Sequence, residues 1–114
     1  MGDHQGAIDD YTQAIRNDLR NAKAFFNRGL ARRKLRDFKG AISDFNMAIS
    51  LDASYGLAYY HRSRAYKAFG NNKQAINDVN IAIDLLLKQG DMETYKQAVK
   101  YLDDLTEYQQ FFPY

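Results

Sequence analysis

Two stretches of the chain combine positive charge with aromatic and amide side chains. Residues 19–36 contain seven Lys or Arg and no Asp or Glu, and residues 53–70 contain three together with His61. Lys and Arg bind carboxylates through charge-assisted hydrogen bonds. The formal net charge of the whole chain is only +2, so this positive charge is a local feature. The pattern therefore favours recognition of acidic groups at two related places.

The residues that catalysis needs are not arranged for it. The chain has no Cys, which excludes a disulfide, a thiolate zinc site and a Cys nucleophile. The two histidines, His4 and His61, lack metal-ligand spacing, and no phosphate-binding loop or G-x-S-x-G sequence occurs. Adjacent acids at 9–10 and 103–104 point in different directions on a helix. We expect no catalytic residues, no metal and no cofactor.

The basic stretches belong to a repeat of 34 residues. GAIDDYTQAIRND begins at Gly6, GAISDFNMAISLD begins at Gly40, and KQAINDVNIAIDL supplies a third copy. The matching columns hold Ala7, Ala41 and Ala75; Asp10, Asp44 and Asp78; Ala14, Ala48 and Ala82; Phe25 and Tyr59; Arg28 and Arg62. A fixed period of this length indicates stacked supersecondary units.

Each unit has the pattern of two amphipathic helices joined by a short turn. Phe38, Ala41, Ile42 and Phe45 follow the three-and-four spacing of a helix face. Asp37 is expected to cap the second helix, with Asp3 and Asn71 in the same role elsewhere. Gly29 and Ser63 stand inside first helices, which predicts close approach to a second helix at Ala41 and Ala75. The recurring Arg28–Asp44 and Arg62–Asp78 columns predict ion pairs that orient the packed helices.

These residues resemble the tetratricopeptide repeat (TPR) pattern. Phe25 and Tyr59 stand at its Trp, Gly29 at its Gly, Ala41 and Ala75 at its Ala, and Phe45 at its Phe. Departures include Arg28 and Arg62 in place of Leu. The resemblance implies an all-α fold, an α-solenoid of helix-turn-helix repeats in a right-handed superhelical stack. It also implies a non-catalytic module for protein–protein interaction.

The repeat predicts one TPR domain over residues 1–114. We expect a half repeat at 2–21 with a second helix only, full repeats at 22–55 and 56–89, a capping helix at 91–110 and a tail at 111–114. The half repeat suggests a fragment of a longer array. The capping helix carries a polar face, as a solenoid end requires. Without a signal pattern or a long apolar run, the chain is expected to be cytoplasmic.

In the family resembled, first helices line the concave surface. By spacing, the predicted groove comprises Lys23, Phe26, Asn27, Leu30, Arg33, Lys34, Leu57, Tyr60, His61, Arg64 and Lys67. We expect it to bind an extended, acidic peptide or partner segment. Asn27 would bond the peptide backbone, and Phe26 and Tyr60 would supply apolar area.

Other interpretations remain open. Some TPR modules grip a C-terminal carboxylate with Lys and Asn, then Asn, then Lys and Arg. Asn27 matches the middle position, but Leu57 and His61 stand where the last pair would be, which argues against that mode. One alternative is a spacer role, and another is self-association as a homodimer through the uncovered N-terminal helix. The basic, Tyr-rich helices also suit single-stranded nucleic acid, against which the low net charge argues.

Overall fold

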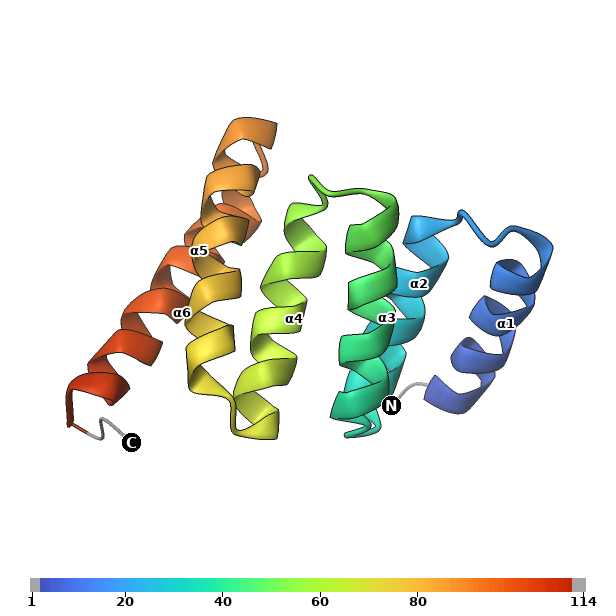
Figure 1. The fold of residues 1–114 in the computed structure, drawn as a ribbon, viewed down its shortest axis with the longest axis horizontal. Helices are drawn as coiled ribbons and strands as arrows, with labels where there is room; N and C mark the ends of the chain where they lie inside the picture. Colours follow the sequence, from blue (N-terminus) through green and yellow to red (C-terminus); the bar gives the residue numbers. More distant parts are fainter. Residues whose placement is uncertain (1–2, 112–114) are drawn as a thin grey trace.

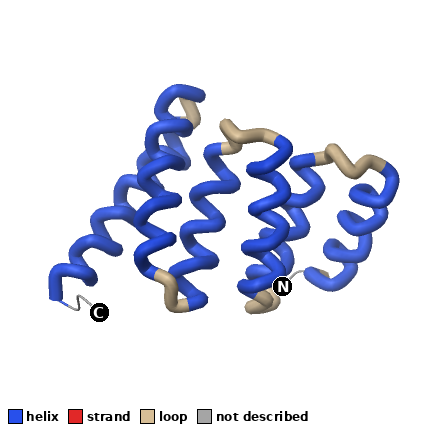
Figure 2. The backbone as a smooth tube through the Cα atoms, viewed as in Figure 1, coloured by secondary structure: helices blue, strands red, loops and turns tan. Residues whose placement is uncertain are grey.

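The structure, a computed structural model, describes residues 3–111. Six α-helices follow one another in this part of the chain (Figure 1): α1 His4–Asn17, α2 Ala22–Lys34, α3 Phe38–Leu51, α4 Gly56–Phe69, α5 Asn72–Gln89 and α6 Met92–Phe111. The described residues contain no strand (Figure 2). The predicted tail, apart from its first residue, lies outside the described range.

The helices stack in chain order into an elongated body. Each helix packs on the next, and α2 also touches α4. Figure 1 shows α1 at one end of the row and α6 against α5 at the other. The extents are 45 × 29 × 25 Å. This arrangement confirms an α-solenoid of helical hairpins, in which contacts run mainly between neighbours.

The predicted capping residues start the second helices. The side chains of Asp3, Asp37 and Asn71 each accept a hydrogen bond from the backbone N–H three residues further on. The turns before them need unusual backbone: Gly70 has φ of 93° and Arg36 has φ of 65°. Such positive angles suit glycine and strain an arginine. The turns therefore lie directly before Asp37 and Asn71, the capping residues that the sequence predicted.

The helices approach closely because the repeat places alanine and glycine at the crossings. Ala41, Ala48, Ala75 and Ala82 are fully buried. A Cβ added at Gly29 would lie 2.7 Å from Cε1 of Phe45. The close approach predicted at Gly29 is thus present, and the atoms nearest to the glycine are those of the Phe45 ring. At the equivalent Ser63, the hydroxyl donates to the backbone carbonyl of Ala75, as close approach at that position requires.

Helix α6 ends the described stack with one apolar and one polar side. Ala98 and Leu105 are buried against the preceding helices. The predicted polar face is exposed, at Glu93, Lys96, Gln97, Lys100, Asp103, Asp104 and Glu107. No helix among residues 3–111 has both the length and the apolar character that a membrane span requires.

Candidate functional site

The predicted arginine–aspartate pairs form and fix the rotation of the first helices. Arg28 donates to both carboxylate oxygens of Asp44, at 3.0 Å from Nε and 2.8 Å from Nη2. Arg62 makes the same two-pronged contact with Asp78, at 2.7 Å for each bond. Asp44 and Asp78 are only 2% and 0% exposed. Because these arginines turn towards second helices, the bases on other faces of α2 and α4 remain available for other contacts.

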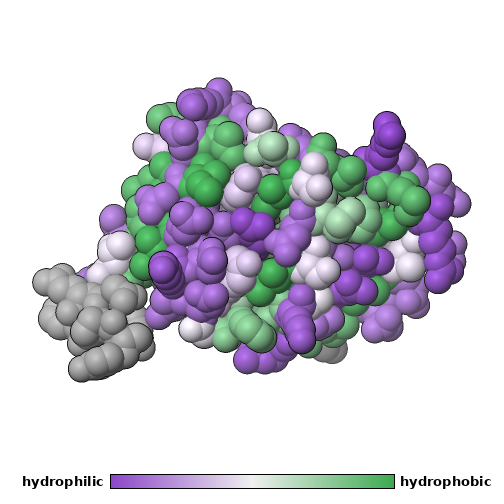
Figure 3. Space-filling model, viewed as in Figure 1, coloured by the Kyte–Doolittle hydropathy of each residue, from purple (hydrophilic) through white to green (hydrophobic). Residues whose placement is uncertain are grey.

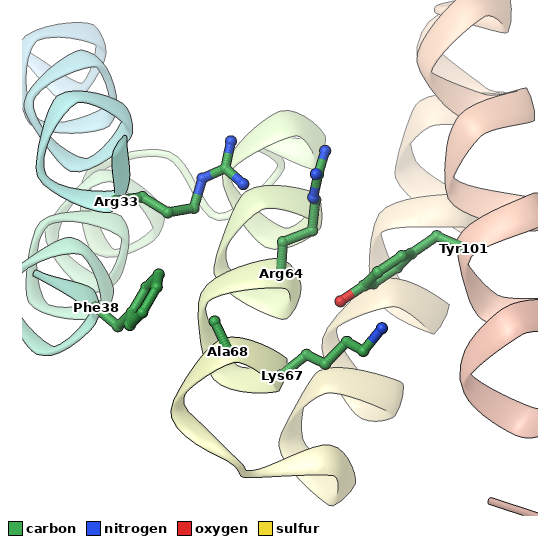
Figure 4. A pocket seen from close by; sticks show the side chains of 6 residues that line it. All are labelled: Arg33, Phe38, Arg64, Lys67, Ala68 and Tyr101. Atoms are coloured by element: carbon green, nitrogen blue, oxygen red, sulfur yellow. The ribbon is translucent and has the colours of Figure 1, made fainter. Parts of the chain in front are cut away.

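Three of the predicted groove cations line one hollow. Arg33 of α2 and Arg64, Lys67 and Ala68 of α4 surround it, together with Phe38 of α3 and Tyr101 of α6 (Figure 4). The hollow has a volume of about 320 Å³ and no acidic residue in its lining. We call it the cationic hollow. It brings together Arg33, Arg64 and Lys67, three of the residues assigned to the groove, from two successive repeats.

Aromatic rings support the cations of this hollow. The guanidinium carbon of Arg64 lies 5.8 Å from the centre of the Tyr60 ring, and Nζ of Lys67 lies 5.7 Å from the centre of the Tyr101 ring. Tyr60 and Tyr101 meet edge to face with ring centres 5.9 Å apart. Cation–π contacts of this kind hold a charged group in place without neutralising it.

The pKa values of Arg33 and His61 are lowered by burial and by nearby positive charge. Burial lowers the pKa of Arg33, and repulsion from Arg64 lowers it further. Burial also lowers the pKa of His61 to about 3, with additional repulsion from Arg33, Arg64 and Lys34. His61 is therefore neutral at physiological pH. No acid among the described residues forms an ion pair with Arg33 or Arg64.

Three buried polar atoms at and beside the cationic hollow have no hydrogen-bond partner within residues 3–111: Arg33 Nε, His61 Nδ1 and the Tyr101 hydroxyl. Ser63 lies beside Tyr101, and its hydroxyl donates to the carbonyl of Ala75. Burial raises the pKa of Tyr101 to about 12, so its O–H remains a donor. Buried polar groups are normally satisfied by protein or by water, so these three atoms mark an under-bonded polar region at and beside the hollow.

A second hollow lies between α1 and α2. Its lining includes Asn27, Leu30 and Lys34 from the predicted groove, with His4, Ala7, Tyr11 and Ala31, around a volume of about 180 Å³. An adjoining depression of similar size is lined by Tyr11, Ala14, Asn21, Lys23, Ala24 and Asn27. We call the two together the N-terminal hollow. The predicted groove residues are thus divided between two places.

Two of the remaining predicted residues are buried, and the others are half-buried. Phe26 and Tyr60 are 6% and 4% exposed, so they do not supply the exposed apolar area expected of them. Phe26 instead packs against Phe45, Tyr55 and His61. Leu57 is half-buried and contacts both core clusters. These side chains support the groove from below.

Sequence reasoning missed Phe38 and Tyr101 in the cationic hollow. Phe38 was assigned to the packed face of its helix, and its ring lies 5.3 Å from the guanidinium of Arg36 as well as in the hollow. Tyr101 belongs to the predicted capping helix, to which no groove residue was assigned. Its aromatic side chain on that helix was the available signal. In the view of Figure 3, hydrophobic and hydrophilic residues are interleaved over the surface.

Comparison with known proteins agrees with the architecture. The tetratricopeptide repeat family matches residues 22–55. The second TPR domain of the human RPAP3 protein, solved in complex with the HSP70 peptide SGPTIEEVD, is 31% identical, with a TM-score of 0.79, over 90% of this chain and 81% of that one. Comparison with curated protein sequences gives no match.

Two further solved structures are similar. The first TPR of Spaghetti (RPAP3), bound to the HSP90 peptide SRMEEVD, is 29% identical, with a TM-score of 0.82, over 91% of this chain and 78% of that one. The TPR2B domain of yeast Sti1 in its pHsp70 complex is 24% identical, with a TM-score of 0.87, over 92% and 84%. The helical hairpins, their 34-residue period and these matches define a TPR protein. The chain belongs to the tetratricopeptide repeat family.

Proposed function

We propose that the chain is a non-catalytic peptide-binding module that takes an extended, acidic segment of a partner protein along the face of α2 and α4. The single observation that carries this proposal is the cationic hollow. Arg33, Arg64 and Lys67 gather there from two repeats, and none of the described residues pairs them with an acid. An acidic ligand removes the mutual repulsion of these groups.

The N-terminal hollow supports the same proposal at the other end of the face. Asn27 and Lys34 line it, and they offer an amide and an ammonium group to a backbone and a carboxylate. A peptide that contacts both hollows would run across α2 and α4 and use several weak sites at once. Extended ligands gain affinity in this way from separate pockets.

The similar structures favour this class of ligand. The peptides named for the two RPAP3 domains share the acidic ending Glu-Glu-Val-Asp. Here Leu57 and His61 occupy the positions where a carboxylate-gripping TPR would have Lys and Arg. The proposal therefore concerns acidic side chains of an extended segment, and the identity of the partner protein is left to experiment.

The test compares fluorescently labelled peptide pools that are rich in Glu, in Lys or in Ser, with binding measured by anisotropy. We expect the Glu pool to bind and the Lys pool not to bind. Arg33→Gln with Arg64→Gln should weaken Glu-pool binding by roughly tenfold or more. Arg20→Gln is the matched control, because Arg20 is exposed in the α1–α2 connection and outside both hollows.

Two results would contradict the proposal. Equal binding of the acidic and basic pools would show that charge recognition is absent. Tight binding of a single-stranded oligonucleotide with a steep salt dependence, and no binding of any peptide pool, would favour nucleic-acid recognition instead.

A further inference from the structure

We propose that the cationic hollow of Arg33, Arg64, Lys67 and Tyr101 is a subsite for a phosphoryl group carried on the bound peptide. The inference rests on the proposed function, because it assigns a ligand chemistry to one part of the same face. The proposed function requires only an acidic peptide, whereas this inference specifies one compact dianion bound at one place. The argument depends on charge, on the directions from which donors arrive and on the unsatisfied atoms.

The charge of the hollow exceeds what one carboxylate balances. Two guanidinium groups and one ammonium group line it, and its lining contains no Asp or Glu. A phosphomonoester carries about −1.5 to −2 at neutral pH, against −1 for a carboxylate. Arg33 and Arg64 are close enough for repulsion to lower the pKa of Arg33. A dianion between them relieves more of that repulsion than a Glu side chain would.

The donors come from three different helices, which suits a tetrahedral ligand. Arg33 reaches over from α2, Arg64 and Lys67 rise from α4, and Tyr101 extends from α6 (Figure 4). A planar carboxylate has two oxygens and is met most fully by a single arginine fork, as Arg28 meets Asp44. A phosphoryl group presents three acceptor oxygens, so separate donors on several sides can each find one.

Two of the unpartnered atoms belong to this lining. Arg33 Nε and the Tyr101 hydroxyl have no hydrogen-bond partner in the described part of the chain, and both atoms are almost fully covered, so a ligand oxygen reaches them only when the surrounding side chains turn aside. Burial keeps the Tyr101 phenol protonated by raising its pKa to about 12. A hydroxyl that stays protonated donates to an anion. The other well-placed arginines, Arg28 and Arg62, are already occupied by buried aspartates, so they do not compete for the ligand.

The test uses three peptide pools that are identical except for one fixed central residue: phosphoserine, Glu or Ser. We expect the phosphoserine pool to bind roughly tenfold or more tightly than the Glu pool. Arg64→Gln and Tyr101→Phe should each remove most of that preference, and the Tyr101→Phe change keeps the ring that packs on Tyr60. Arg20→Gln is again the control and should preserve it. Circular dichroism checks that each variant is folded.

The outcomes separate this inference from the proposed function. If the phosphoserine and Glu pools bind equally, and Arg64→Gln weakens both alike, the subsite accepts carboxylates and the inference is overturned, while the peptide-binding function stands. If neither pool binds, both are overturned. Inorganic phosphate is added as a competitor: displacement of the phosphopeptide by phosphate at the same affinity would assign the hollow to the free ion and would also overturn a peptide-borne ligand.

Discussion

At the scale of single residues, the arginine–aspartate pair is the main polar element of the interior. Asp44 is 2% exposed and accepts from Arg28 at 2.8 Å and 3.0 Å and from Arg32 at 3.0 Å. Removing the carboxylate leaves two guanidinium groups without their partner. We expect Asp44→Ala to lower the free energy of unfolding by about 3–5 kcal/mol, measured by urea denaturation.

A double-mutant cycle isolates the pair itself. Arg28→Met and Asp44→Asn should be non-additive by about 1–3 kcal/mol, because the two side chains share a bidentate contact. The exposed Lys88–Asp84 pair, whose side chains are 71% and 68% exposed, provides the comparison. Its coupling should be near 0.3–0.5 kcal/mol at most. Additive effects at Arg28 and Asp44 would show that each residue acts by itself.

His61 gives the fold a defined pH dependence. Its pKa is about 3 in the folded chain, because of burial and nearby Arg33, Arg64 and Lys34, against about 6.5 when unfolded. Below about pH 6.5 the unfolded chain binds this proton more readily, so stability falls as the pH decreases towards 3. Between pH 7 and pH 5 we expect a loss of roughly 2 kcal/mol from this group.

The variant His61→Gln separates this contribution from other titrating groups. Its unfolding free energy should vary less with pH than that of the unchanged chain over the same interval. Urea denaturation at several pH values measures both. Parallel pH profiles for the two proteins would mean that His61 titrates normally and is open to solvent.

Single residues also show how far the sequence determines the site. The Arg28–Asp44 and Arg62–Asp78 pairs were predictable, because both partners recur at the repeat period. The third contact, from Arg32 to Asp44, was not, since Arg32 has no counterpart in the next repeat. Tyr101 was missed for a related reason. Its approach to Lys67 depends on how α6 packs against the stack, and no repeated column records that position.

At the scale of helices, close packing depends on small residues at the crossings. A Cβ at Gly29 would lie 2.7 Å and 2.9 Å from two ring carbons of Phe45, which is itself fully buried. We expect Gly29→Ala to destabilise the chain by about 1–3 kcal/mol, although alanine favours a helix by about 1 kcal/mol. Thermal or urea denaturation measures the change.

A second substitution shows whether the ring is the cause. Replacing Phe45 with Leu in the Gly29→Ala background removes the nearest ring carbons, so the added methyl group should then cost less than it does beside phenylalanine. If the cost of Gly29→Ala is the same with either residue at position 45, the destabilisation arises elsewhere in the α2–α3 crossing.

Each capping residue stabilises the one second helix that it begins. The side chain of Asp37 accepts from the backbone N–H of Gly40 at 2.9 Å, and Asn71 accepts from Gln74 at 3.1 Å. Replacing either by Ala should lower stability by about 1 kcal/mol, and by Gly less. Denaturation midpoints of the paired variants test this. An Asp37→Gly change as costly as Asp37→Ala would argue against a capping role.

Some features of the helices could be predicted from the sequence, and others could not. The existence and order of the hairpins followed from one 34-residue period, because each copy reinforces the others. The depth of individual side chains did not. Phe26 was assigned to the groove by spacing, yet it is 6% exposed, because Tyr55 at the end of its own repeat and His61 from the following repeat pack against it. Packing against neighbouring repeats decides which side chains are buried. The residue pattern of a single helix does not show how those repeats are oriented.

At the scale of the whole molecule, we expect the ease with which each helix unfolds to depend on its position in the stack. Most contacts join consecutive helices, and α4 also touches α2 and α6. In such a stack, stability is approximately a sum of neighbour interfaces, so an end helix with one substantial interface opens more readily than a central one. Among the described helices, α1 packs substantially on α2 alone, whereas α3, α4 and α5 each have partners on both sides.

Hydrogen exchange of backbone amides measures this gradient directly. We expect α1 to exchange fastest of the helices and α3 and α4 to be protected most, with α6 intermediate because Tyr60 and Tyr101 join it to α4 as well as α5. Asp44→Ala should reduce protection across α2 and α3 first, since the lost contacts link those two helices. Uniform protection from α1 to α6, lost all at once in the variant, would contradict this because it would require the six helices to unfold as one unit.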